Sequence, residues 1–109
     1  MFIGKIVGTV VSTQKDEGLR GFKLLVAQAI DPATGELGSS YVVACDAIGS
    51  GDDDVVLIVA GSSARMTERT KNKPVDSAIV AIVDHIECNG KLTYRKFEEA
   101  EARSAPRGN

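Results

Sequence analysis

The stretch DAIGSGDDDVVLIVAGSSAR, residues 46–65, carries the signals on which the fold depends most. A Gly-x-Gly turn at 49–51 and an acidic loop lead into an uninterrupted apolar run over 55–60, which ends in a Gly-Ser-Ser-Ala-Arg corner. Short apolar runs bounded by Gly and Asp are typical of buried strands. Glycine permits backbone angles and close approaches that a side chain would block. The stretch therefore has the parts of a tight structural joint around one strand.

Similar apolar and β-branched runs recur on both sides of this stretch, at 2–13, 22–30, 40–45, 78–86 and 92–96. Turn signals separate them, and the strongest is Asn89-Gly90, which predicts a hairpin. The pattern predicts an all-β fold: a small closed or partly open β-barrel of oligonucleotide-binding-like topology, with one or two short helices. We expect one helical turn over 46–50 and a brief helix over 64–67, with Ser62 or Ser63 as its N-cap.

Length and composition indicate one small domain. The chain has 109 residues, of which 43% are hydrophobic, and we divide it into a barrel domain over 1–96 and a charged C-terminal tail over 97–109. A formal net charge of −2 argues against nucleic acid as a partner, because phosphate binding needs a basic face. No apolar run is long enough to span a membrane, and no signal peptide is expected. Two cysteines without a CxxC spacing predict reduced thiols.

No group of residues has the pattern of a catalytic, metal or cofactor site. His85 is the only histidine, and a general base needs a positioned partner. The corner at 61–65 lacks the second glycine of a nucleophile turn. The run Asp52-Asp53-Asp54 does not converge on one cation, because adjacent side chains of an extended segment point apart. We therefore predict a solvated acidic turn there, no enzyme activity and no cofactor.

Three ordered blocks carry a family resemblance. They are GKIVGTVVSTQK at 4–15, the stretch at 46–65, and NKPVDSAIVAIVD at 72–84. Together they resemble the vertex proteins of bacterial microcompartments, the EutN/CcmL type of pentameric shell protein. The resemblance covers roughly residues 1–96 and implies the same small barrel fold.

The resemblance also implies a function. It implies a structural protein that forms homopentamers, contacts hexameric shell proteins, and lies in the cytoplasm within a microcompartment shell, with no nucleic-acid or membrane partner. In the family the Gly-rich turn lies near the five-fold axis, so Gly49, Ser50 and Gly51 are candidates for lining a central opening. This chain has Asp52-Asp53-Asp54 where the family pattern usually continues Gly-x-Gly with Glu, which predicts a more negative rim.

Subunit contacts are predicted at Ser62, Ser63, Arg65 and Asp76. A guanidinium suits a carboxylate fork, with Asp76 or Asp46 as acceptor, and an ordinary pair within one chain is the alternative for Arg65. The run 78–83 is apolar on both faces, which implies a second covered face that an adjacent subunit could supply in part. Lys15, Lys71 and Lys73 are candidates for the outer rim.

The alternative function is a single-stranded nucleic-acid-binding module, since the predicted topology is shared. Such a module needs aromatic side chains interleaved with basic residues on its strands. Here the aromatic residues are scattered and the basic residues are not clustered; the aromatics are Phe2, Phe22, Tyr41, Tyr94 and Phe97. A small-molecule enzyme or carrier that uses the barrel mouth is a third possibility, and the missing His/Cys/acid group weighs against it.

Overall fold

The computed structural model describes residues 1–96, so the predicted tail at 97–109 lies outside the described residues. Strands and two short 3₁₀ helices make up the described part, in this order: β1 (Phe2–Val10), η1 (Glu17–Leu19), β2 (Lys23–Ile30), β3 (Leu37–Asp46), β4 (Val55–Ala60), η2 (Gly61–Arg65), β5 (Ser77–Ile82), β6 (His85–Cys88) and β7 (Lys91–Arg95). The all-β prediction is confirmed.

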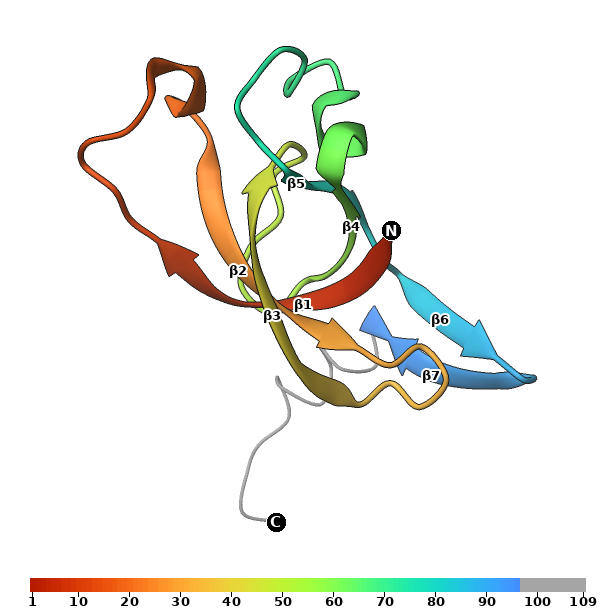
Figure 1. The fold of residues 1–109 in the computed structure, drawn as a ribbon. Coiled ribbons are helices and arrows are strands. Elements are labelled where there is room, and N and C mark those ends of the chain that lie inside the picture. Colours follow the sequence, from red (N-terminus) through yellow and green to blue (C-terminus); the bar gives the residue numbers. More distant parts are fainter. Residues whose placement is uncertain (97–109) are drawn as a thin grey trace, which may run out of the picture.

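Five of the strands form a closed barrel in the order β1-β2-β3-β5-β4, with β4 returning to β1 (Figure 1). All neighbours are antiparallel except β3 and β5, which run parallel and pair only at Cys45–Ala78 and Asp46–Ile79. This order is the oligonucleotide-binding topology that the sequence predicts. Closure leaves each barrel strand with two neighbours, which protects its backbone hydrogen-bonding groups.

The barrel interior is a small aliphatic core. Alternate residues of neighbouring strands point inward, as at Ile6, which lies opposite Ala27. The fully buried members are Ile6, Leu25, Ala27, Ala44, Val56, Ile58 and Ile79. Burying each branched side chain contributes about 1.5–3 kcal/mol to folding. The fully buried part of the core is therefore aliphatic, and Phe2 packs against it from a half-buried position.

The run predicted as one strand over 78–86 is two strands, so that prediction is wrong. β5 ends at Ile82, the chain bends at 83–84, and β6 pairs with β7 in a separate hairpin (Figure 1). The bend lets Ile86 pack in a second cluster beside Ile30 and Val55. Apolar periodicity does not distinguish one long strand from two that join different sheets.

The β6–β7 hairpin turns at Asn89-Gly90, as predicted. Both residues have positive φ, 54° and 78°, which is the requirement of a type I′ turn. The hairpin is attached to the β2–β3 turn, because the Thr93 hydroxyl donates to the Pro32 carbonyl oxygen at 2.8 Å. Gly35 in that turn lies against the Thr93 backbone, where a Cβ atom would collide.

A third cluster, which we call the outer cluster, covers the outside of the barrel beside β5. It is built from Cys45, Ala64, Val75 and Ala78, with half-buried residues around them. Ala78 packs in this outer cluster while its neighbour Ile79 packs in the barrel core. The two apolar faces of β5 are thus both covered at this point by the chain itself.

Candidate functional site

The connection that follows β3 is organised by the buried carboxylate of Asp46. Its Oδ1 accepts hydrogen bonds from the N–H groups of Ile48, Gly49 and Ser50 at 3.1–3.2 Å. The Ser50 hydroxyl donates to the same oxygen at 2.9 Å. A carboxylate that binds the backbone just ahead of it favours a turn over a helix. The predicted helical turn over 46–50 is therefore wrong, and the segment is a bend around Asp46.

Lys23 on β2 completes this arrangement. Its Nζ donates to the Ser50 carbonyl oxygen at 2.7 Å and lies 3.6 Å from Oδ2 of Asp46. Burial by itself raises the pKa of Asp46. Four interactions lower the same pKa and together outweigh burial: the hydrogen bonds from the Ser50 N–H, the Ile48 N–H and the Ser50 hydroxyl, and the positive charge of Lys23. The pKa of Asp46 is therefore below its ordinary value of 3.8. Asp46 is therefore ionised at neutral pH.

The three residues predicted to line an opening differ in what they expose. The Ser50 side chain is fully buried against Asp46, so this turn presents its glycines rather than its serine. Gly49 has φ of +87°, a conformation that favours glycine. The φ of Gly51 is not positive. A Cβ atom added at either glycine would meet no other atom within 4 Å. Both glycines thus face open space in the isolated chain.

The acidic run after the turn is less open to solvent than predicted. Oδ2 of Asp54 accepts a hydrogen bond from the Gly51 N–H at 2.9 Å, and its Oδ1 lies 4.0 Å from Nζ of Lys96. Asp53 lies 3.9 Å from Nζ of Lys5. Asp52 and Asp53 are exposed and Asp54 is half-buried. Nearby lysines therefore offset part of the negative charge that the sequence places here.

The corner after β4 is η2, and it differs in detail from the predicted helix over 64–67. It is a 3₁₀ helix over 61–65 whose N-cap is Ala60, with no side-chain hydrogen bond to the cap. Ser62 and Ser63 are exposed instead of capping. The fully buried Ala64 anchors the corner in the outer cluster. No serine side chain caps this helix, and the buried Ala64 packs it against the barrel.

Arg65 and Asp76 lie on adjoining segments. Nη1 of Arg65 donates to the Val75 carbonyl oxygen at 3.1 Å, and the Gly61 N–H donates to the Asp76 carbonyl oxygen at 2.8 Å. Both side chains are exposed. Asp46 is buried and fully engaged with its own turn, so the structure does not bring it to Arg65.

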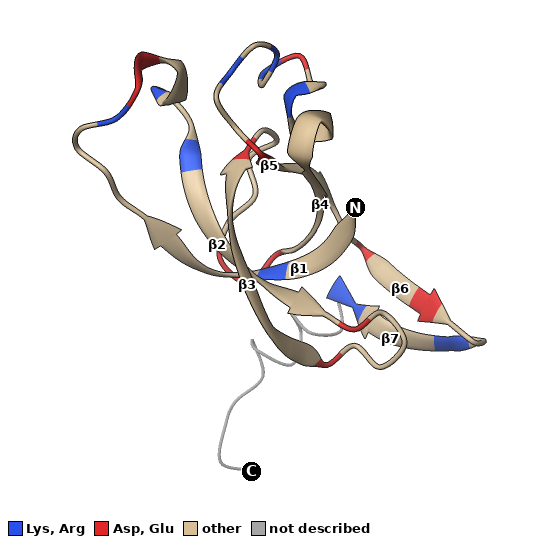
Figure 2. Ribbon diagram, viewed as in Figure 1, with Lys and Arg blue, Asp and Glu red and all other residues tan. Residues whose placement is uncertain are grey.

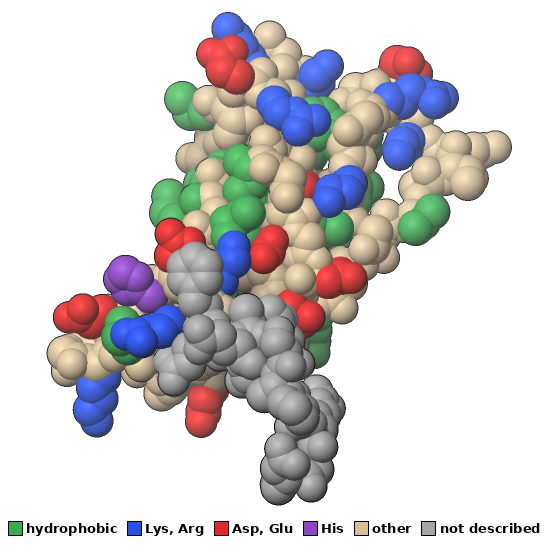
Figure 3. Space-filling view, turned by 180° about the vertical axis from the view of Figure 1, so that it is seen from behind, with side chains coloured by type: hydrophobic (Ala, Val, Ile, Leu, Met, Phe, Trp, Pro, Cys, Tyr) green, Lys and Arg blue, Asp and Glu red, His purple; other side chains and the backbone are tan. Residues whose placement is uncertain are grey.

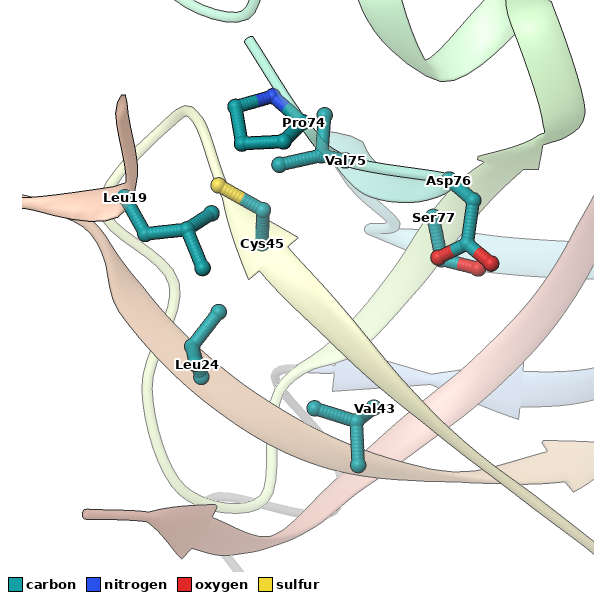
Figure 4. A pocket seen from close by; sticks show the side chains of 8 residues that line it. All are labelled: Leu19, Leu24, Val43, Cys45, Pro74, Val75, Asp76 and Ser77. Carbon is teal, nitrogen blue, oxygen red and sulfur yellow. The ribbon is translucent and has the colours of Figure 1, made fainter. Parts of the chain in front are cut away.

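A groove of about 190 Å³ lies beside Asp76 on the outer cluster (Figure 4). Cys45 points into it toward Pro74, and Asp76 lies at the opposite side. Its walls are mostly apolar: Leu19, Leu24, Val43, Cys45, Pro74, Val75, Asp76 and Ser77.

The Cys45 thiol in this groove has a raised pKa. Burial is the main cause, the negative charge of Asp46 raises the pKa further, and the positive charge of Arg69 lowers it. The thiol is therefore neutral and unreactive at neutral pH.

The lysines predicted for an outer rim lie on two loops that touch. Gly18 of the first loop packs against Pro74 of the second, where a Cβ atom at Gly18 would be 2.7 Å from the proline ring. Lys15 is on the first loop, with Lys71 and Lys73 on the second, and Lys71 is exposed while the other two are half-buried. Figure 3 shows several basic side chains toward this end of the molecule.

Within residues 1–96, no three His, Cys, Asp or Glu side chains are placed to hold a metal ion. His85 is exposed at the start of β6. Cys45 and Cys88 are free thiols. None of the helices in this part of the chain is long and apolar enough to cross a bilayer.

Aromatic side chains are also poorly placed for nucleic-acid bases. Among the described aromatic residues only Tyr41 is exposed, at 61%. Phe22 is covered by Arg69, whose guanidinium carbon lies 5.3 Å from the ring centre. Basic residues are scattered over loops and several strands and do not follow one strand face (Figure 2). A stacking platform of the kind used for single strands is missing from residues 1–96.

The geometry defines a class: a small closed β-barrel of oligonucleotide-binding topology, in which a buried carboxylate holds the turn between β3 and β4. Comparison with known proteins gives the family. The chain belongs to the family described as "Ethanolamine utilisation protein EutN/carboxysome", which it matches over residues 1–84. The family predicted from the sequence is thereby confirmed.

Relatives cover nearly the whole chain. The carboxysome shell vertex protein CcmL of Nostoc sp. is 48% identical over 100 residues, which is 91% of this chain and 98% of that protein. Its structure aligns with a TM-score of 0.81 over 88% of this chain and all of that chain. The GrpN pentameric microcompartment shell protein of Rhodospirillum rubrum aligns with a TM-score of 0.73 at 40% identity, over 81% and 99% of the two chains.

Sequence reasoning missed the most ordered part of this site, the contacts of Asp46 and Lys23. An Asp just before a Gly-Ser-Gly segment is itself a signal for a turn held by the carboxylate. Lys23 gives no such signal, because it reaches the turn from a strand 27 residues earlier in the sequence.

Proposed function

We propose that this protein is a structural component of a bacterial microcompartment shell, where its homopentamers form the vertices. The observation that carries the proposal is similarity along almost the entire length to a shell vertex protein, in both sequence and structure. A relative that aligns at 40% identity is a pentameric shell protein. This function places the protein in the bacterial cytoplasm, in contact with hexameric shell proteins, and requires no enzyme activity or cofactor.

The mechanism is geometric. A ring forms when one patch of each subunit contacts a different patch of the next, and the contact must hold a rotation of about 72° for five copies to close. A closed barrel supports such a contact because its strands and connections are held from several sides. Five-fold rings among hexagonal tiles introduce curvature, and that curvature closes a flat sheet into a polyhedron.

Two regions of the subunit take the contacts in this proposal. The turn at 49–51 faces the five-fold axis, with Gly49 and Gly51 bordering the opening. Arg65 anchors the subunit contact, supported by Ser62, Ser63 and Asp76, which are exposed on the same and the adjoining segment. Arg65 keeps donors for a neighbour, because the described hydrogen bond uses only Nη1 of its guanidinium.

Native mass spectrometry tests the assembly. The purified protein should give a mass five times the 11.5 kDa of the chain. Arg65→Ala should raise the concentration needed for assembly and leave the barrel folded, since the side chain is exposed. The matched control is Arg20→Ala, which removes an exposed arginine paired only locally with Glu17. A monomer at micromolar concentration would contradict the proposal, and equal assembly of both variants would remove Arg65 from the contact.

The nucleic-acid alternative is tested separately. Fluorescence anisotropy with a labelled oligonucleotide should show no binding at physiological salt, because residues 1–96 present no basic strand face and only one exposed aromatic side chain, Tyr41. Sub-micromolar binding would restore that alternative.

A further inference from the structure

The connection between β3 and β4 is held by a polar clamp, formed by Asp46 and Ser50 together with Lys23 of β2. We infer that this clamp is the device that sets the shape of the axial turn, with Asp46 and Lys23 as its positioning residues. The inference rests on the proposed function, since it gives the turn a role at the five-fold axis.

The clamp acts on the turn from two directions. Asp46 lies at the end of β3 and binds three successive N–H groups, at Ile48, Gly49 and Ser50. Lys23 lies on the neighbouring strand and binds the carbonyl oxygen of Ser50. Because both residues are in register on adjacent barrel strands, the turn is tied to the barrel wall and not only to itself. Movement of the turn relative to the barrel therefore breaks several hydrogen bonds at once.

Apolar packing contributes little to holding this turn. Ile48 is 41% exposed, and the Cβ positions of Gly49 and Gly51 meet open space. A segment with two glycines has high conformational freedom in the absence of other restraints. The clamp therefore supplies most of the restraint on residues 48–50. A pre-ordered turn loses less conformational entropy when it meets its copies, and this favours assembly.

Position in the ring multiplies the effect. If the turn borders the axis, any displacement appears five times around the opening and changes its width and the fit of the neighbouring turns. Asp46 and Lys23 thus control this opening through the turn that they hold.

Three variants test the clamp. Asp46→Ala removes the shared acceptor, and Lys23→Met removes the bond to Ser50 while leaving a side chain of similar length on β2. Asp31→Ala is the matched control, because Asp31 caps the β2–β3 turn in the same way, accepting from the Ala33 N–H at 2.8 Å. Lys23→Arg should restore much of what Lys23→Met loses. Lys23 is about half exposed, so its variants should fold even if Asp46→Ala does not.

Two measurements are needed: amide hydrogen exchange of 48–50, and the concentration at which half the protein is pentameric by native mass spectrometry. Asp46→Ala and Lys23→Met should speed exchange at 48–50 about tenfold or more and raise the half-assembly concentration about tenfold, with exchange in β1 and β2 unchanged. Asp31→Ala should do neither.

The outcomes separate the two claims. A wild-type protein that is never pentameric contradicts the proposed function, whatever the exchange rates are. A pentameric wild type whose clamp variants assemble at unchanged concentration overturns the clamp's role in the ring, even if their turns exchange faster. Unchanged exchange in both Lys23→Met and Asp46→Ala overturns the clamp itself.

Discussion

The connections on either side of β4 are held by different forces. Residues 47–54 lie around a buried carboxylate and a lysine, and their exposed side chains do little packing. Residues 61–76 contain no buried charged side chain: backbone hydrogen bonds hold them together with apolar contacts, in which Ala64 and Val75 are buried in the outer cluster. One barrel thus uses two kinds of restraint: the first connection should respond to changes of charge, and the second to changes of volume.

The largest effect is expected for a change of charge at the first connection. Asp46→Asn should lower the free energy of unfolding by about 3 kcal/mol, because hydrogen bonds to a charged acceptor are stronger and the new amide must face Lys23. The measurement is urea unfolding at one fixed protein concentration, since assembly also contributes to stability. Glu68→Gln, an exposed change in the second connection at a residue outside the proposed subunit contact, should stay within about 0.5 kcal/mol. Equal losses would show that the two connections do not differ in their response to charge.

A change of volume at the second connection should come next. Ala64→Leu adds three carbon atoms to a site with no exposed surface, and we expect a loss of about 2 kcal/mol in the free energy of unfolding. Glu68→Leu, an addition of apolar volume at an exposed position nearby, is the control and should change stability little. If Ala64→Leu were neutral, packing would not be what holds η2 in place.

A pair of glycine variants separates backbone strain from crowding inside the first connection. Gly49→Ala should cost about 1 kcal/mol, because φ of +87° is unfavourable for a residue with a Cβ atom. Gly51→Ala should leave monomer stability unchanged or slightly raised, since neither φ nor space opposes it. Chemical unfolding measures both effects. Crowding of the axis by Gly51→Ala would appear only in the pentamer mass spectrum, and a destabilised monomer would contradict the open space around Gly51.

The smallest effect concerns pH. The pKa of Asp46 is lower in the folded protein than its ordinary value of 3.8, so its ionisation stabilises the fold fully above about pH 4. This contribution is lost as pH falls through the folded pKa. The stability difference between wild type and Asp46→Asn should therefore shrink in urea titrations below pH 4, and a constant difference would contradict the assignment.

Local signals in the sequence were sufficient for several elements. Asn89-Gly90 placed a hairpin turn correctly, because a two-residue turn with positive φ at both positions is a property of those residues alone. The first four barrel strands and their approximate bounds followed from apolar runs between turn residues. The family could also be inferred, because its three sequence blocks stand in order along one chain.

Other features depended on parts of the chain that are far apart in sequence. The division of 78–86 into β5 and β6 reflects which sheet each half joins, and the start of η2 reflects the burial of Ala64. Contact assignments for Ser62, Ser63, Arg65 and Asp76 stay predictions, as do those for the turn at 49–51.

Local propensity and the order of motifs were thus enough to define the fold class, the hairpin turn and the family. The pairing of Asp46 with Lys23, and its separation from Arg65, emerged only when the barrel closed. A carboxylate takes its role from the donors that folding brings within hydrogen-bonding distance, and no local pattern records which donors those are.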